Sequence, residues 1–270
     1  MSKKPLLSII VATYKRPNNL KNKIDKLKKK YKKNLFELII VQEQSDYQTI
    51  QFTRKLSFGF IKVINSRFNN VDHAIRVGCN KAKGYFVVIH GDDDYFDNYN
   101  FDYLIKILKK NKSYDWIIGY GKYVDYNGKI IRNFTNQIKK KFLQINNFYI
   151  LRIINFLVCQ SVFINRKTLL QIGGYPIKYK FGSDHSLWLK LIRKKRKIIL
   201  KNLSYCTYDY RTISGKFNLK KYLGFLRLIN SENNSVILKF LAFVFLAIKF
   251  IIHINLYFYK KFFSKISIML

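Results

Sequence analysis

The chain has 270 residues, of which 49% are hydrophobic and 17% aromatic, and it carries 51 Lys and Arg against 15 Asp and Glu. This length and apolar content exclude a disordered polybasic protein, and the formal net charge of +36 predicts anionic partners such as nucleotide phosphates, an acidic membrane surface or nucleic acid. Three isolated cysteines argue against a disulfide framework or a zinc site and fit a reducing cytoplasm. The N-terminus runs into a strand-like segment without an apolar signal region, so secretion is not expected.

Apolar runs of strand length alternate with segments of helical spacing along the N-terminal third of the chain. The helix after the first strand is expected to begin at Asn18 or Asn19, because a short polar side chain there can cap the first free N–H groups. Strands that alternate with helices predict a parallel, doubly wound sheet. The strands are predicted at residues 6–12, 36–41, 60–64 and 85–90, and a further helix at residues 71–82.

Polar residues follow three of these strands directly, at residues 13–16, 43–46 and 92–94. In a parallel sheet the three loops meet at one edge, which is where such folds bind their ligands. The third loop holds three consecutive aspartates, whose mutual repulsion is relieved by a hard divalent cation such as Mg²⁺ or Mn²⁺. The alternative interpretation is a solvated acidic turn that caps the next helix.

The second half of the chain is less regular. Residues 99–110 and 166–172 are predicted helices, residues 116–126 and 157–164 are predicted strands, and Asn127-Gly128 indicates a hairpin turn. Residues 139–156 are basic and aromatic and support no assignment. A last helix is expected from Leu187, Trp188 and Leu191, with Asp184 in its first turn. On spacing alone, Ser183 or Asp184 could simply be the N-cap of this helix.

The ordered motifs resemble the family 2 glycosyltransferases. They are S-I-I-V-A-T-Y-K-R-P at residues 8–17, the segment at residues 37–45, and A-K-G running into D-D-D at residues 82–94. The resemblance extends to about residue 215 and implies a GT-A fold, an α/β Rossmann-like arrangement with a mixed, mainly parallel sheet flanked by helices. It also implies a nucleotide-diphospho-sugar donor, with a UDP-sugar expected, a divalent metal (Mn²⁺ or Mg²⁺) and an acceptor hydroxyl.

The resemblance also assigns donor-site roles to individual residues. The loop after the first strand would contact the base and ribose, Glu43 takes the place of a base-binding aspartate, and the aspartate cluster corresponds to a DXD-type motif. Three departures stand out: Gln42-Glu43-Gln44-Ser45 replaces the usual D-D-G-S, Arg76 stands where asparagine is common, and Gly91 stands where the first acid of the cluster often lies. The implied donor residues are Thr13, Tyr14, Arg16, Glu43, Asp92, Asp93 and Arg211, and the implied metal ligands are Asp92 and Asp94.

The catalytic residue that the resemblance implies is Asp184, in a segment similar to the family's E-D-x-x-x-W helix. Ser183 replaces the glutamate of that motif. A carboxylate there can take the proton of an attacking hydroxyl, and the macrodipole of the helix favours its ionised form. Arg211 would stabilise the leaving diphosphate. A solvated loop arginine is the alternative at that position.

The C-terminal segment differs from the rest, which suggests a catalytic domain at residues 1–220 and a tail at residues 221–270. Residues 236–259 are strongly apolar, and on a helix Lys239, Lys249, His253 and Lys260 would form one basic stripe. We expect an amphipathic helical tail on an anionic membrane, placing the protein in the cytoplasm, peripheral at the inner face of the cell membrane. A helix packed on the catalytic domain or another subunit, and a spanning helix, are the alternatives.

The favoured function is an inverting, metal-dependent glycosyltransferase that acts on a glycan or lipid-linked acceptor of the cell envelope. A nucleotidyltransferase would use a similar metal–diphosphate edge, but it usually has a glycine-rich loop after the first strand, and residues 12–17 contain no glycine. A non-enzymatic nucleic-acid or membrane binder is the third possibility. The basic residues are spread along the chain instead of clustering on one element, so nucleic acid is not an expected partner.

Overall fold

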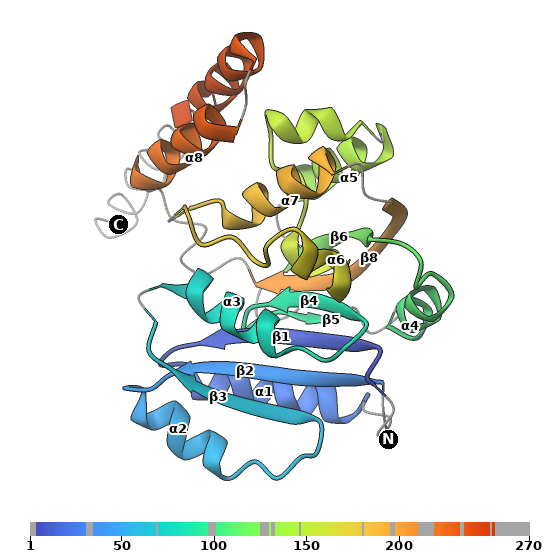
Figure 1. The fold of residues 1–270 in the computed structure, drawn as a ribbon, viewed down its shortest axis with the longest axis vertical. Helices are drawn as coiled ribbons and strands as arrows, with labels where there is room; N and C mark the ends of the chain where they lie inside the picture. Colours follow the sequence, from blue (N-terminus) through green and yellow to red (C-terminus); the bar gives the residue numbers. More distant parts are fainter. Residues whose placement is uncertain are drawn as a thin grey trace, which may run out of the picture.

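The fold is a single eight-stranded mixed sheet flanked by helices (Figure 1). The computed structural model describes residues 4–30, 35–68, 70–96, 101–124, 130, 133–145, 147–179, 181–194, 198–209, 219–232, 235–248 and 250–251. The strand order is β3-β2-β1-β4-β7-β6-β8-β5. This arrangement confirms the predicted α/β class with a mixed sheet.

The N-terminal half is the parallel part of the sheet. β1 lies between β2 and β4 and is parallel to both, and β2 is parallel to β3. Thr13 at the end of β1 pairs in register with Gln42 of β2, and Val11 pairs with His90 of β4, so the carboxyl ends of the three strands lie at one edge. The elements are β1 (Leu7–Thr13), α1 (Pro17–Lys28), β2 (Phe36–Glu43), α2 (Tyr47–Arg54), β3 (Ile61–Ser66), α3 (Val71–Lys81) and β4 (Phe86–His90).

Both faces of the inner strands β1, β2 and β4 are buried, which explains why these strands read as continuous apolar runs. Ile9 and Val11 of β1 point into one core and Ile10 into the other. α1 covers the first face and α3 the second, as expected for a doubly wound sheet. The predicted start of α1 was wrong, because the helix begins at Pro17 with Arg16 in the N-cap position. Proline suits the first helical turn, since its φ is already helical and it has no N–H to satisfy.

The C-terminal half adds antiparallel strands. β7 is antiparallel to both β4 and β6, while β6 and β8 are parallel. The additional elements are β5 (Tyr95–Phe96), α4 (Phe101–Lys110), β6 (Trp116–Val124), α5 (Asn133–Ile145), the 3₁₀ turns η1 (Phe148–Arg152) and η2 (Cys159–Ser161), β7 (Val162–Asn165), α6 (Arg166–Gln171), α7 (Ser183–Arg193) and β8 (Ile198–Asp209).

Several predictions for this half need correction. The strand predicted at residues 157–164 is shorter, because residues 159–161 form a 3₁₀ turn and only β7 pairs with its neighbours. The unassigned segment at residues 139–156 contains most of α5 and all of η1. The Asn127-Gly128 turn lies outside the described residues.

The last described elements are two helices that project from the sheet at the end opposite α2 (Figure 1). They are α8 (Leu219–Glu232) and a helix that begins at residue 236 and is described to residue 251 except for residue 249. The two pack together through Tyr222 and Phe250, whose rings lie 5.2 Å apart and nearly perpendicular. Within the described part of the chain, no helix is both long and apolar enough to span a bilayer.

Candidate functional site

The loops after β1 and β4 are joined by direct contacts between polar side chains. The Thr13 hydroxyl donates to Asp92 Oδ2 at 2.9 Å. The Arg16 guanidinium lies between two aspartates, with Nη1 at 2.9 Å from Asp92 Oδ1 and 3.1 Å from Asp93 Oδ2. The convergence predicted from the strand ends is therefore found at these residues.

The charges of this cluster are strongly coupled. Burial, followed by the neighbouring carboxylate of Asp92, raises the pKa of Asp93. Burial alone would lower the pKa of Arg16, but the adjacent Asp92 and Asp93 outweigh it and raise that pKa. Arg16 thus stays positively charged and offsets the repulsion between the two carboxylates.

Asp94 is the most deeply enclosed of the three aspartates. Its Oδ2 accepts hydrogen bonds from the Gly91 backbone N–H at 2.5 Å and from Gln160 Nε2 at 2.9 Å. Its Oδ1 is buried and has no hydrogen-bond partner among the described residues. Burial, partly opposed by the charge of nearby Lys23, raises the pKa of Asp94 to about 7. An enclosed carboxylate oxygen without a partner is unfavourable, and a bound cation or a proton would satisfy it.

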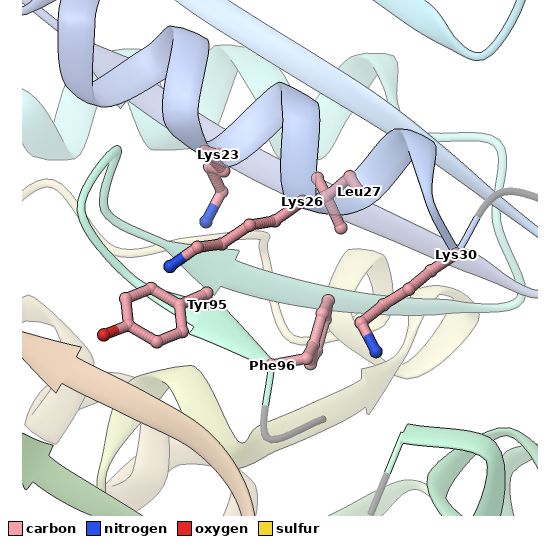
Figure 2. Close-up of a pocket in the computed structure, with 6 residues that line it drawn as sticks. All are labelled: Lys23, Lys26, Leu27, Lys30, Tyr95 and Phe96. Carbon is pink, nitrogen blue, oxygen red and sulfur yellow. The ribbon is translucent and has the colours of Figure 1, made fainter. Parts of the chain in front are cut away.

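A buried lysine, Lys23, contacts the main chain of the aspartate loop; Figure 2 shows its side chain on α1. Lys23 of α1 donates to the main-chain oxygen of Asp94, and its Nζ lies 3.2 Å from Nδ1 of His90. Burial and this ammonium hold the pKa of His90 well below its usual range, so the ring is neutral and its Nε2–H can donate to the Gln160 carbonyl at 3.1 Å. His90 is therefore a hydrogen-bonded core residue.

The hollow drawn in Figure 2 is too small for a substrate. It is lined by Lys23, Lys26 and Leu27 of α1, by Lys30 after the end of that helix, and by Tyr95 and Phe96. Its volume of about 10 Å³ accommodates about one water molecule. Lys26 Nζ lies 3.5 Å from the centroid of the Tyr95 ring, and burial lowers the pKa of Lys26. This cluster joins α1 to β5 and so helps to fix the end of the aspartate loop.

The loop after β1 is held in an uncommon backbone conformation by the loop after β2. Lys15 has a φ of 55°, and its N–H donates to Asp46 Oδ2 at 2.5 Å. Asp46 also accepts from the N–H and the hydroxyl of Thr49, at 3.2 and 2.5 Å. Burial alone would raise the pKa of Asp46, but these bonds outweigh it and lower that pKa. A left-handed lysine beside a ligand edge is typical of a functional loop.

An open pocket of about 450 Å³ lies beside this loop. The loop after β1 contributes Thr13 and Tyr14, and the loop after β2 contributes Glu43. Glu43 Oε2 accepts from the Phe68 N–H at 2.9 Å, which ties the second loop to the chain entering α3. The remaining lining residues are Ala12, Ser45, Phe68, Asn70 and Val71. An aromatic pocket of this size with one carboxylate is suited to a nucleotide base.

Asp184 lies at the start of α7 and is positioned by a glycine. Gly182 occupies the N-cap position with a φ of 86°, so neither Ser183 nor Asp184 is the N-cap, and that alternative is wrong. Asp184 Oδ2 accepts from Asn155 Nδ2 at 3.1 Å. Asp184 is half-buried, which leaves it accessible to a substrate.

Asp72 provides a second buried carboxylate beside this helix start. Its Oδ2 lies 2.8 Å from the Ser183 hydroxyl, and its Oδ1 lies 3.4 Å from the Tyr175 hydroxyl. Burial raises the pKa of Asp72 to about 6, with a further increase from the charge of Asp184. Asp72 belongs to the first turn of α3, next to Val71 in the pocket wall, and its bonding partner Ser183 is the sequence neighbour of Asp184.

Residues 8–173 match the family model described as "Glycosyl transferase family 2", which covers more than half of the chain. The chain belongs to the family 2 glycosyltransferases. An uncharacterized glycosyltransferase of Methanocaldococcus jannaschii is 23% identical over 198 residues, covering 72% of this chain and 67% of that protein. An uncharacterized glycosyltransferase of Rickettsia felis is 28% identical over 197 residues, covering 70% of this chain but only 32% of that protein.

Solved structures share the fold of this glycosyltransferase. The crystal structure of S. aureus TarS 1-349 in complex with UDP-GlcNAc superposes with a TM-score of 0.59 at 18% identity, covering 84% of this chain and 66% of that one. The crystal structure of S. aureus TarS 1-349 gives a TM-score of 0.57. This confirms the expected GT-A fold, and family membership favours sugar transfer over nucleotidyl transfer or nucleic-acid binding.

The structure brings together most of the residues singled out in the sequence. Thr13, Arg16, Asp92 and Asp93 are in contact, Tyr14 and Glu43 line the adjacent pocket, and Asp94 closes the same loop. Asp184 belongs to a separate part of the site, reached through Asp72 and Ser183. Arg211 lies outside the described residues.

Three residues of the site were not expected from the sequence. Asp72 and Lys23 are single charges within helices, and only their burial distinguishes them from solvated residues. Asp46 was noted only as part of a polar loop. The D-x-x-T spacing from Asp46 to Thr49 is a helix-capping pattern that could have located it.

The aspartate loop fits a metal that is shared with a bound diphosphate, but not a closed protein cage. Among the described residues, no three Asp, Glu, His or Cys side chains gather in a metal-binding group. Mg²⁺ is commonly held by one or two carboxylates together with substrate phosphates. The unpartnered Asp94 Oδ1 and the neighbouring Asp92 carboxylate are suited to that role.

Proposed function

We propose that this glycosyltransferase transfers a sugar from a nucleotide-diphospho-sugar to an acceptor hydroxyl with inversion at the anomeric carbon. The observation that carries the proposal is that Thr13 and Glu43, at the ends of β1 and β2, line one pocket, and that Thr13 also bonds Asp92 of the loop after β4. Asp72, next to Val71 of the pocket wall, bonds Ser183, the neighbour of Asp184. TarS, which shares this fold, is known in complex with UDP and with UDP-GlcNAc, which supports a UDP-sugar as the donor.

In this proposal the donor base occupies the pocket beside Tyr14 and Glu43, with Thr13 and Arg16 toward the ribose and phosphates. Asp92 and Asp94 would hold a divalent cation, Mn²⁺ or Mg²⁺, and Asp93 would lie near the ribose. Such a cation neutralises charge that develops on the departing diphosphate. The fixed positive charge of Arg16 contributes to the same edge, and Arg211 is the further candidate for stabilising the leaving group.

Asp184 is the proposed general base. Its carboxylate takes the proton of the acceptor hydroxyl while that oxygen forms a bond to the anomeric carbon. The bond between the anomeric carbon and the diphosphate oxygen breaks in the same step, and its electron pair leaves with the nucleoside diphosphate. Asn155 fixes the orientation of the carboxylate through its 3.1 Å hydrogen bond, which keeps one face of Asp184 for the acceptor.

Equilibrium binding of nucleotide sugars tests the donor assignment. Wild type, Asp94→Ala and the control Asp102→Ala, which removes an exposed acid of α4, would be titrated with UDP-, GDP-, CMP- and dTDP-sugars in Mn²⁺, Mg²⁺ or EDTA. We expect one nucleotide class to bind wild type and the control only with metal, and Asp94→Ala to lose that binding. Failure of all donors to bind, or equal binding by all three proteins, would overturn the proposal.

A further inference from the structure

The helix that follows α8 exposes an apolar face of unusual extent. Residues 236–248 read V-I-L-K-F-L-A-F-V-F-L-A-I, in which Lys239 is the only charged residue. The face turned toward α8 is buried through Ala242 and Leu246. The opposite face, called here the outer face, is exposed and consists of Val236, Ile237, Phe240, Leu241, Phe243, Val244, Ile248 and Ile251.

The outer face presents large apolar side chains where a water-exposed helix would present polar ones. A helix at a water-exposed surface normally presents polar residues outward and apolar residues inward. Here Lys239 is half-buried, while Phe240 and Phe243 are 64% and 54% exposed. A contiguous surface of large apolar side chains marks a contact with a protein or with a membrane.

The charge of the sequence that carries this face favours a lipid surface over a protein. After Glu232 the sequence contains five lysines and no acidic residue. Glu232 is itself paired with Arg193 at 2.6 Å, so it adds no free negative charge nearby. An anionic bilayer offers both acyl chains for the outer face and head groups for the lysines.

We propose that the outer face docks this glycosyltransferase on an anionic membrane, with the helix lying in the plane of the interface. The inner face of the helix packs on α8, so the helix is part of the folded protein and can contact the membrane only through its outer face. Aromatic and branched side chains enter the boundary between head groups and acyl chains, while basic side chains remain at the head groups.

The docking helices are connected to the start of α7, which carries Asp184. A Cβ at Gly182 would lie only 2.9 Å from Leu228 and 3.0 Å from Phe225, so α8 packs against this turn. Glu232 of α8 also contacts Ser186 at 3.3 Å in addition to its pair with Arg193. A membrane-docked α8 thereby orients Asp184 relative to the lipid surface. Together with the proposed function, this indicates an acceptor hydroxyl carried on a lipid.

Vesicle co-sedimentation of the full chain tests the docking. Wild type would be mixed with vesicles of phosphatidylcholine alone, or of equal parts phosphatidylcholine and phosphatidylglycerol. The variant Phe240→Glu/Phe243→Glu removes the outer-face aromatics. The control Ile145→Glu/Leu170→Glu adds the same charge at apolar positions of α5 and α6 that are 59% and 41% exposed.

We expect wild type and the control to bind the anionic vesicles, with binding that weakens in high salt, and to bind phosphatidylcholine at least about tenfold more weakly. Each lost phenylalanine should weaken binding to the anionic vesicles about tenfold or more. Equal binding by the outer-face variant overturns the proposal. The proposal is also overturned if wild type does not bind vesicles but forms a dimer in light scattering, and the outer-face variant is a monomer.

Donor binding by the same proteins separates this inference from the proposed function. The outer-face variant should bind the nucleotide sugar as tightly as wild type, because the substitutions are remote from the pocket at Thr13 and Glu43. Loss of donor binding by all proteins with vesicle binding intact would refute the proposed donor alone and leave the docking standing.

Discussion

The buried carboxylate of Asp72 makes a sharp prediction about stability and pH. Burial raises its pKa from 3.8 to about 6, so the folded state binds more protons than the unfolded state between these values. Its contribution to stability is therefore complete below pH ~4 and is lost as pH rises through about 6. Two pKa units correspond to about 3 kcal/mol. At pH 8 the ionised Asp72 carboxylate therefore lowers the free energy of unfolding by about that amount.

Asp72→Asn should therefore stabilise the protein at pH 8. Asparagine has the same shape, and its side-chain oxygen can still accept the Ser183 hydrogen bond. We expect urea denaturation to show a gain of about 1–3 kcal/mol at pH 8 that vanishes near pH 4. Ser183→Ala is the matched control, because it leaves the carboxylate without this donor and should destabilise by about 1–3 kcal/mol at pH 8. A loss of stability in Asp72→Asn at pH 8, or a change independent of pH, would refute the reasoning.

Three further substitutions probe other parts of the site. Gly182→Ala should lower the free energy of unfolding by about 2 kcal/mol or more, measured by urea denaturation, because the φ of Gly182 is 86° and a Cβ would meet Phe225 and Leu228. A variant as stable as wild type would contradict this packing. Glu43→Gln should raise the KM for the donor about tenfold with little change in kcat. The substitution keeps an acceptor for the Phe68 N–H but removes the charge proposed to face the base. An unchanged KM in steady-state kinetics would exclude this role. Arg16→Gln should lower stability by about 1 kcal/mol at pH 8, a figure kept small because the guanidinium is 35% exposed. The loss should be smaller in acid, where Asp93, whose pKa is raised, becomes protonated; equal losses at pH 8 and in acid would argue against the Arg16–Asp93 ion pair.

The parallel half of the sheet was predictable because three of its strands, β1, β2 and β4, are buried on both faces. The runs at residues 6–12 and 36–41 are apolar throughout and end in polar residues, so periodicity and length identify both the strand and its end. The position of those ends then locates the ligand edge. Thr13, Glu43 and Asp92 were placed correctly for this reason.

The antiparallel half was predicted less well because its pairing depends on contacts distant in sequence. β7 was predicted too long, since residues 157–158 are apolar for packing but do not pair with a neighbouring strand. α1 was shifted because Pro17 starts the helix before the asparagines that could have capped it. The role of Gly182 depends on a positive φ that composition does not reveal.

The site residues that were not predicted are those whose roles depend only on contacts with residues distant in sequence. Lys23 resembles the exposed lysines around it in α1, yet it is buried against His90 and the Asp94 carbonyl. Asp72 resembles an ordinary first-turn acid until Ser183, far away in sequence, is placed against it. The outer face of the C-terminal helix likewise becomes visible only when α8 covers the other side.

The role of Asp184 is tested most directly by separating donor binding from turnover. Wild type, Asp184→Asn and the control Asp25→Asn, which changes an exposed acid of α1, would be compared for donor Kd and for release of nucleoside diphosphate. We expect all three Kd values to agree within about twofold and Asp184→Asn alone to lose about 100-fold or more in turnover. Turnover by Asp184→Asn equal to that of wild type would contradict a mechanism in which this carboxylate accepts the proton of the acceptor.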